Sequence, residues 1–184
     1  MEPEFRSLLY AEPHLYDVVF PDTDGSLPRM CRDALRRYMT AAPASALDIG
    51  CGTGQLLDAL AETVPECWGV DLLDTNVAYA RATRPRLHVV QGDMRSVRLG
   101  WTFDLVTSFG NALSYALTDD DVARTMDTYA AHAHAGRRIF AGARPAPPTR
   151  AACGVASSTP LPAGSTSGRA RHRLVALRDD ERDR

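Results

Sequence analysis

Residues 46–54 read Ala-Leu-Asp-Ile-Gly-Cys-Gly-Thr-Gly, and this stretch decides the fold. A short apolar run contains one acidic residue, Asp48, and three glycines then alternate with small side chains. Residues 55–61 have the spacing of a helix, so the segment predicts a buried strand, a tight turn and a helix start. Open α/β sheets bind nucleotide-like ligands at such a turn. We expect glycine there because a Cβ would hold a ligand off the backbone and because the turn needs positive φ.

Two classes of ligand use such a turn, and the spacing of the glycines distinguishes them. A dinucleotide site follows the pattern G-x-G-x-x-G/A, with the pyrophosphate at the helix N-terminus. Here Gln55 occupies the third glycine position of that pattern, and the third glycine comes one residue early, at Gly54. Asp48 would also repel an incoming pyrophosphate, whereas a carboxylate suits a ligand with a cationic amino-acid end. An NAD-dependent oxidoreductase is therefore the less favoured alternative.

Three further segments follow in order, and each is typical of a strand that ends beside a ligand. Residues 67–72 form a strand pattern that includes Asp71, an acid placed to accept both hydroxyls of a ribose. Residues 87–91 form a second pattern, which is followed by Gly92-Asp93-Met94. Residues 103–108 form a third, which is followed by Phe109-Gly110-Asn111.

The four segments together resemble the motifs of class I S-adenosylmethionine-dependent methyltransferases, whose first motif commonly reads (D/E)-x-G-x-G-x-G. The resemblance covers roughly residues 8–140 and implies S-adenosylmethionine as cofactor. It implies that Asp71 holds the ribose, that Asp93 accepts from the adenine amino group, and that Leu72 and Met94 sandwich the ring. Ordinary core packing stays open as the alternative for Met94. The residues that the resemblance assigns to the cofactor are Asp48, Gly50, Cys51, Gly52, Gly54, Asp71, Leu72, Asp93, Met94 and Phe109.

Residues 109–115 lie where a methyl acceptor should approach. This segment resembles the G-N-S-x-x-H segment of glycine N-methyltransferases and, more loosely, a loop of the macrolide amino-sugar N-methyltransferases. The resemblance makes Asn111 and Tyr115 the candidate catalytic and substrate-binding residues, because an amide can bind a polar acceptor and a phenol can orient or deprotonate it. Tyr10 and Tyr16 resemble the N-terminal segment that these enzymes fold over the cofactor and are candidate substrate contacts. A packing role stays open for each of them.

Composition narrows the class of partner. The net charge of −2 and the pI near 6.2 give no basic face for nucleic acid. The charged N-terminal residues predict no secretion signal, and no run reaches transmembrane length, so we expect a cytoplasmic protein with no membrane partner. The 4 cysteines lack CxxC spacing and are expected to be reduced. His132 and His134 have no third ligand nearby, so no metal is expected. The expected partner is a small-molecule substrate, and a homodimer is allowed.

The chain divides into three regions. Residues 1–43 are expected to be a helical segment that covers the site, with an amphipathic helix at 27–39. Residues 44–142 form the expected S-adenosylmethionine-binding core, with further helices at 74–82 (Asp74 as N-cap) and 118–134 and a strand that begins at 138–140. This alternation predicts a doubly wound, Rossmann-like parallel sheet flanked by helices, without the usual C-terminal strands.

Residues 143–184 are expected to be a poorly ordered tail. From residue 141 onward the chain contains no aromatic residue and is rich in Ala, Arg, Pro, Gly, Ser and Thr. We interpret residues from about Gly136 or Arg137 onward as an altered ending that a shift of reading frame produces. A genuine disordered tail on a minimal domain is the alternative.

The sequence thus predicts methyl transfer from S-adenosylmethionine to a nitrogen, oxygen or carbon atom of a small molecule, plausibly in secondary metabolism. Such an in-line displacement depends on positioning and desolvation more than on one universal catalytic residue. The alternative hypothesis is a catalytically defective or non-catalytic S-adenosylmethionine-binding product of a frame-shifted gene.

Overall fold

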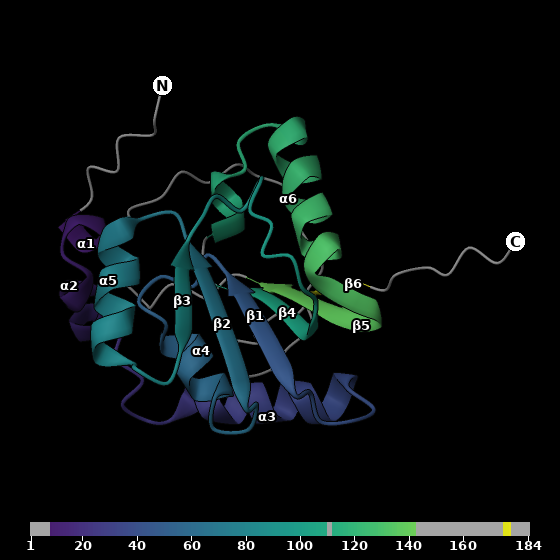
Figure 1. Cartoon of the computed structure of the whole chain (residues 1–184). Coiled ribbons are helices and arrows are strands. Elements are labelled where there is room, and N and C mark those ends of the chain that lie inside the picture. Colours follow the sequence, from purple (N-terminus) through teal and green to yellow (C-terminus); the bar gives the residue numbers. More distant parts are fainter. Residues whose placement is uncertain (1–7, 110–111, 143–174, 178–184) are drawn as a thin grey trace, which may run out of the picture.

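The computed structural model of the chain describes residues 8–109, 112–142 and 175–177 (Figure 1). The helices are α1 (Leu8–Ala11), α2 (Pro13–Val19), α3 (Ser26–Tyr38), α4 (Gln55–Leu60), α5 (Asp74–Thr83) and α6 (Asp119–His132), with a 3-10 turn η1 (Ala112–Tyr115). The strands are β1 (Ser45–Ile49), β2 (Glu66–Asp71), β3 (His88–Gln91), β4 (Phe103–Phe109), β5 (Ala133–Gly142) and β6 (Val175–Leu177).

The six strands form one sheet in the order β3-β2-β1-β4-β5-β6. Strands β1 to β5 are parallel, and β6 pairs antiparallel with β5. The chain moves outward from β1 to β3 and then returns to place β4 on the other side of β1. The carboxyl ends of β1 and β4 therefore form a topological switch point, where open α/β sheets bind ligands. This confirms the predicted doubly wound sheet.

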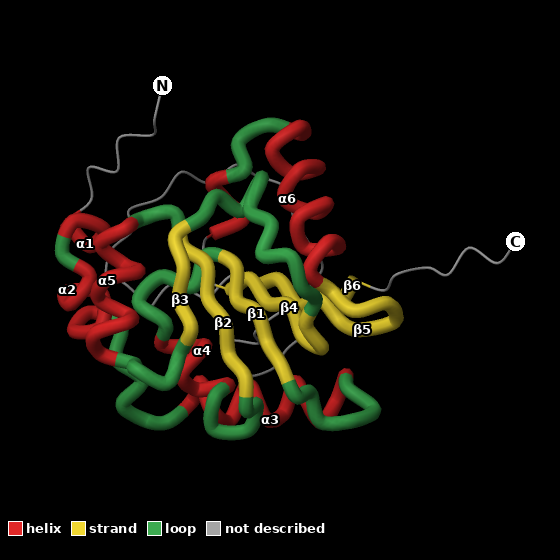
Figure 2. Tube along the Cα trace, viewed as in Figure 1, coloured by secondary structure: helices red, strands yellow, loops and turns green. Residues whose placement is uncertain are grey.

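Helices cover both faces of the sheet, as Figures 1 and 2 show. On one face α3, α4 and α5 contribute Cys31, Leu57 and Ala80 to a buried cluster. On the other face Tyr129 of α6 is fully buried and packs in a cluster with Phe103. Each face buries apolar side chains against helices, which explains why the strands read as nearly continuous apolar runs.

Helices α1 and α2 lie beside α5, beyond the β3 edge of the sheet (Figure 1). They are short and carry few buried residues, with Pro13 the buried side chain of α2. Asp17 of α2 forms polar contacts with the core, and these contacts are described with the site.

The helix starts agree with the sequence with one exception. Thr118 caps α6 and accepts from the backbone N–H of Asp121, with three aspartates in the first turn as the helix dipole favours. The expectation that Asp74 caps α5 is wrong, because Leu73 occupies that position. The backbone N–H of Leu73 instead donates to the carboxylate of Asp71 at 3.0 Å.

The C-terminal part of the sheet extends beyond the prediction. Strand β5 begins at Ala133, directly after α6, whereas the sequence predicted a strand that begins at 138–140. Strand β6 lies within the segment predicted as a tail, and no sequence pattern predicted it. Within the described ranges, no helix is both long and apolar enough to cross a membrane.

Candidate functional site

The glycine turn after β1 adopts the backbone conformation that its glycines predict. Gly50, Gly52 and Gly54 have φ values of 80°, 56° and 86°, all in the left-handed region. A Cβ on Gly50 would collide with the Cβ of Ala112, so glycine lets η1 approach the turn. Among the described residues, no heavy atom lies within 4 Å of a Cβ built on Gly52, so this side of the turn is open there. A ligand can therefore approach the backbone at Gly52.

Cys51 lies inside the same turn and is 8% exposed. Its backbone N–H and that of Gly50 both donate to the carbonyl of Val70, at 3.0 and 2.7 Å. Burial raises the pKa of the Cys51 thiol well above its usual value, so the thiol stays protonated. Cys51 therefore contributes backbone geometry and packing rather than a reactive sulfur.

Asp71, at the end of β2, is buried and accepts three hydrogen bonds. One carboxylate oxygen accepts from the backbone N–H of Gly52 at 2.8 Å. The other accepts from Leu73 N–H and from the side-chain amide of Asn76, each at 3.0 Å. The carboxylate predicted to hold a ribose thus also holds the glycine turn in place.

Asp48 is the second buried carboxylate of the site, at 2% exposure. It accepts from the hydroxyl of Thr107 at 2.8 Å and from the backbone N–H of Phe109. Burial, with a smaller contribution from nearby Asp71, raises the pKa of Asp48 to about 6. A carboxylate has about four acceptor sites, so Asp48 retains acceptor capacity for a cation. The positive charge of an ammonium group would offset the cost of burying this carboxylate.

Asp93 follows β3 and is held by Arg95. The Arg95 guanidinium contacts both carboxylate oxygens, at 2.6 Å from Nη2 and 2.9 Å from Nε, and the Arg95 backbone N–H also donates at 2.8 Å. Hydrogen bonding from Arg95 is the main cause that lowers the pKa of Asp93. A third contact joins Arg95 Nη1 to Asp121 of α6 at 3.1 Å. Asp93 is therefore ionised and oriented, with part of its acceptor capacity already in use.

The predicted adenine-facing side chains differ in environment. Leu72 is 40% exposed directly after β2, so one face of its side chain is available to a ligand. Met94 is partly buried and packs against the sheet cluster on the α6 face. The packing interpretation of Met94 is therefore compatible with the structure, and so is a ring contact from its exposed side.

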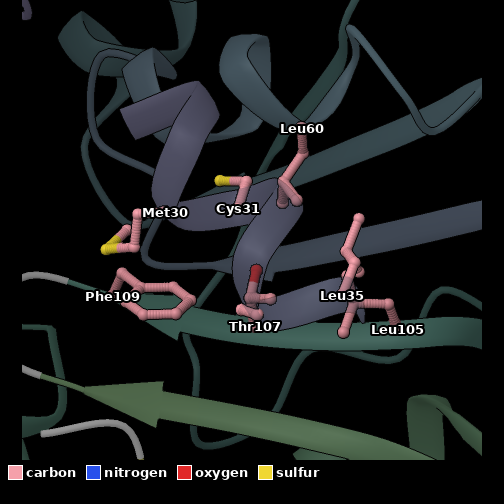
Figure 3. Close-up of a pocket in the computed structure, with 8 residues that line it drawn as sticks. Met30, Cys31, Leu35, Leu60, Leu105, Thr107 and Phe109 are labelled. Carbon is pink, nitrogen blue, oxygen red and sulfur yellow. The ribbon is translucent and has the colours of Figure 1, made fainter. Parts of the chain in front are cut away.

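Phe109 packs on the α3 face and lines an apolar cavity of about 20 Å³, enough for roughly one water molecule. Figure 3 shows Met30 and Phe109 at one end of this cavity and Leu35 and Leu105 at the other. Sequence reasoning did not predict this cavity. It is too small for a substrate and lies between α3 and β4.

The candidate acceptor residues are only partly described. Tyr115 ends η1 and is 39% exposed, and the close approach of Ala112 to Gly50 brings this turn against the glycine turn. Asn111 lies outside the described residues, as does the side chain of Tyr10. Tyr16 is half-buried on α2, with its ring 4.9 Å from that of Phe20.

The sequence assigned no role to Asp17, but the structure places its carboxylate at the centre of a hydrogen-bond network. One carboxylate oxygen accepts from Thr53 Oγ1 at 2.6 Å and from Gln55 Nε2 at 2.8 Å. The other accepts from Arg84 Nη2 at 2.7 Å and from the Tyr79 hydroxyl at 3.2 Å. No local signal marks this network, because Arg84 is distant in sequence and meets Asp17 only in the fold.

His132 has both ring nitrogens engaged by the protein. Nε2 accepts from the backbone N–H of Leu99 at 3.0 Å, so Nδ1 carries the proton and donates to the carbonyl of Thr128 at 2.8 Å. The side chain is 1% exposed. These contacts give His132 a structural role in joining α6 to the loop before β4.

Comparison with known proteins identifies the family. Residues 46–136 match the family described as "Methyltransferase domain". A dTDP-3-amino-3,4,6-trideoxy-alpha-D-glucopyranose N,N-dimethyltransferase of Streptomyces venezuelae is 31% identical over 102 residues, covering 55% of this chain and 43% of the relative. A dTDP-3-amino-3,6-dideoxy-alpha-D-glucopyranose N,N-dimethyltransferase of Streptomyces fradiae is 32% identical over 120 residues, covering 64% and 47%. The chain thus spans about half the length of these curated relatives.

Solved structures of methyltransferases support the same family. The fold superposes on DesVI of Streptomyces venezuelae with a TM-score of 0.66 and 25% identity, covering 76% of this chain and 60% of DesVI. It superposes on SAM-bound CalS10, an amino pentose methyltransferase from Micromonospora echinaspora, with a TM-score of 0.63 and 27% identity, covering 71% and 56%.

The residues present fit the cofactor of this family. The open face of Gly52 admits a ligand to the backbone, and the buried carboxylate of Asp48 suits an ammonium group. When bound there, S-adenosylmethionine supplies an activated methyl group on a sulfonium. By its motifs, its sheet order and its similarity to methyltransferases of known structure, the chain belongs to the class I S-adenosylmethionine-dependent methyltransferases.

Proposed function

We propose that this protein transfers a methyl group from S-adenosylmethionine to the amino nitrogen of a nucleotide-linked amino sugar. The observation that carries the proposal is the switch-point geometry, in which Asp48, the open side of Gly52 and Asp71 adjoin one glycine turn. Similarity to amino-sugar N,N-dimethyltransferases favours nitrogen over oxygen or carbon as the acceptor.

Each proposed cofactor residue has a distinct task. Asp48 pairs with the amino group of the methionine part, and the backbone of Gly50, Gly52 and Gly54 lets that part approach closely. Asp71 accepts from the ribose with the acceptor capacity that its protein contacts leave. Asp93 accepts from the adenine amino group, with Arg95 fixing its orientation. Leu72 and Met94 contact the two faces of the ring.

The acceptor is proposed to bind beside η1. An amine attacks through its lone pair, so it must be uncharged when the carbon–sulfur bond breaks, and one proton must leave the methylated nitrogen. Tyr115 is proposed to orient the amine or to take that proton, and Asn111 to bind a neighbouring hydroxyl of the sugar. Tyr10 and Tyr16 are proposed to cover the substrate from the N-terminal helices.

The test has two stages. Isothermal titration of the purified chain with S-adenosylhomocysteine and with NAD should show binding of the first only, and tighter binding of NAD would contradict the proposal. The chain is then incubated with S-adenosylmethionine and a dTDP-linked 3-amino sugar, and mass spectrometry should detect a product heavier by one or two methyl groups. A matched dTDP sugar with a hydroxyl in place of the amine should remain unmodified.

Cofactor binding without turnover is the second candidate. It is favoured by the composition of residues 141–184, which contain no aromatic residue, whereas substrate pockets are usually lined by apolar and aromatic side chains. Binding of S-adenosylhomocysteine with no methylated product from any amino sugar would favour this candidate. Resequencing the gene tests its cause, because a second frame encoding a strand, a helix and a hairpin would confirm the shift.

A further inference from the structure

The carboxylate of Asp17 joins three elements that are far apart in the sequence. It lies on α2, and its four donors come from the glycine turn, the start of α4 and the helix α5 with its C-cap, namely Thr53, Gln55, Tyr79 and Arg84. Both oxygens have two donors. Burial raises the pKa of Asp17, but the hydrogen bonds from Thr53, Arg84 and Gln55 together lower it below its usual value. Asp17 is therefore ionised at neutral pH.

Arg84 extends this contact to the backbone of the turn. Its Nη1 donates to the carbonyl of Thr53 at 2.8 Å while Nη2 holds Asp17. Thr53 is consequently held at both its hydroxyl and its carbonyl. It lies between Gly52 and Gly54, two of the three left-handed glycines of the turn. Glycine is the most flexible residue, so fixing Thr53 restricts the part of the turn that is freest to move.

A second Arg–Asp pair, Arg86 with Asp58, has a similar arrangement of contacts and serves as a comparison for Arg84 with Asp17. Arg86 Nε lies 2.7 Å from Asp58, and Arg86 Nη2 also donates to a backbone carbonyl, that of Asp58, at 2.6 Å. The side chains of that pair are 50% and 35% exposed, against 14% and 19% for Arg84 and Asp17. Screening weakens the exposed pair far more than the shielded one. Among the described residues, the side chains of Arg86 and Asp58 form no hydrogen bond with the glycine turn, α1 or α2.

We propose that Asp17 is a positioning residue for the cofactor, which fastens α2 over the glycine turn and thereby holds the turn in its binding conformation. The proposal rests on the proposed function, because the ligand whose site is shaped is S-adenosylmethionine. In this proposal Asp17 acts through Thr53, whose hydroxyl donates to its carboxylate, rather than through a contact of its own with the cofactor. The hydrogen bonds and the ion pair of Asp17 join α2 to the glycine turn and to α5 and its C-cap.

The experiment compares full-length Asp17→Asn, Asp17→Glu and Arg84→Gln with the matched controls Asp58→Asn and Arg86→Gln. Two quantities are measured well below the melting temperature: the Kd for S-adenosylhomocysteine and the rate of chymotrypsin cleavage after Tyr10, Tyr16 and Phe20 in the absence of ligand. Asp17→Asn and Arg84→Gln should weaken binding at least tenfold and speed cleavage at least fivefold. The controls should stay within twofold of wild type, and Asp17→Glu should recover affinity to within threefold.

Each result that would contradict the proposal can be distinguished from the others. Faster cleavage with unchanged affinity would show that α2 docking does not shape the turn, and unchanged cleavage would show that Asp17 does not fasten α2; either overturns the proposal. Equal effects in the Asp58→Asn control would also overturn it, because they would reflect general destabilisation. Should Asp17→Asn fail to fold, Thr53→Val removes one hydrogen bond at nearly constant volume and should still weaken binding several-fold. If the wild-type chain does not bind S-adenosylhomocysteine, the proposed function fails, whereas the cleavage rates still decide whether Asp17 fastens α2.

Discussion

The backbone N–H of Gly52 donates to the carboxylate of Asp71 at 2.8 Å, which joins the middle glycine of the turn to the end of the neighbouring strand. The residue that the family motif assigns to the ribose is therefore also part of the scaffold that shapes the turn. The proposed ribose contact and the local stability of the turn thus depend on the same carboxylate, so substitutions of Asp71 should affect both.

Replacing Asp71 by alanine should separate these two effects. Loss of the charged acceptor should cost roughly 1.5–3 kcal/mol of affinity for S-adenosylhomocysteine. The free energy of unfolding should fall by about 1–3 kcal/mol, because the N–H groups of Gly52 and Leu73 and the amide of Asn76 lose their acceptor. Calorimetric titration and urea denaturation measure the two. Asp71→Asn, which retains one acceptor oxygen, should be intermediate, and unchanged affinity in folded Asp71→Ala would leave Asp71 a purely structural role.

Replacing Asp48 by asparagine should make the protein more stable at neutral pH and weaker in binding. The pKa of Asp48 is about 6 in the folded protein, above the ordinary value of 3.8. The folded state therefore binds this proton more readily, so the contribution of Asp48 to stability is lost as pH rises from about 4 to about 6. Asparagine avoids that loss and should raise the free energy of unfolding at pH 7.5 by roughly 1–3 kcal/mol relative to wild type.

Urea denaturation at pH 4 and pH 7.5 checks this prediction. The difference between Asp48→Asn and wild type should be near zero at pH 4 and should grow toward pH 7.5. Affinity for S-adenosylhomocysteine should fall at least tenfold, because the ammonium group loses its ionic partner. A stability difference that does not change with pH would show that Asp48 is not the titrating group.

Gly52→Ala should block the ligand with little harm to the fold. Its φ of 56° disfavours alanine by about 1–2 kcal/mol, but the added Cβ would lie more than 4 Å from every heavy atom outside its own neighbours in the part of the chain that the structure describes. Gly100 is a matched control, because its φ of 85° is also left-handed and a Cβ there would also have no heavy-atom contact within 4 Å in residues 8–109, 112–142 and 175–177. Both alanine variants should lose similar stability in thermal unfolding, whereas only Gly52→Ala should lose affinity. Equal affinities in the two variants would place the ligand elsewhere.

Asn111→Ala and Tyr115→Phe should lower turnover while leaving the Kd for S-adenosylhomocysteine within about twofold, because they are proposed to contact the acceptor. Steady-state kinetics with the methyl-accepting amino sugar, together with calorimetric titration, measure the two effects. If both variants lose cofactor affinity in parallel with activity, these residues belong to the cofactor site.

Local sequence patterns were sufficient to predict the strands and helices of the parallel core. Alternation of apolar strand patterns with helical ones predicted β1 to β4, α3, α4, α5 and α6 close to their observed bounds, because each pattern reports which face of an element is buried. Strand β6 was not predicted, because a short strand in a segment without aromatic residues has too weak a pattern of apolar residues. The cap of α5 was also predicted wrongly, because Leu73 occupies the N-cap position and its backbone N–H donates to Asp71.

The sequence by itself determined the glycine turn, the two acidic residues that adjoin it and the succession of strands and helices along the chain. The need for φ > 0 and apolar periodicity are local properties that a single segment reveals. Only the tertiary structure decided which partners these groups receive. The pairing of Asp17 with Arg84 and Thr53, the bond from Thr107 to Asp48 and the approach of η1 to Gly50 join residues far apart in the chain. Such contacts depend on how helices and strands pack, and packing geometry is a property of the assembled sheet rather than of any one segment.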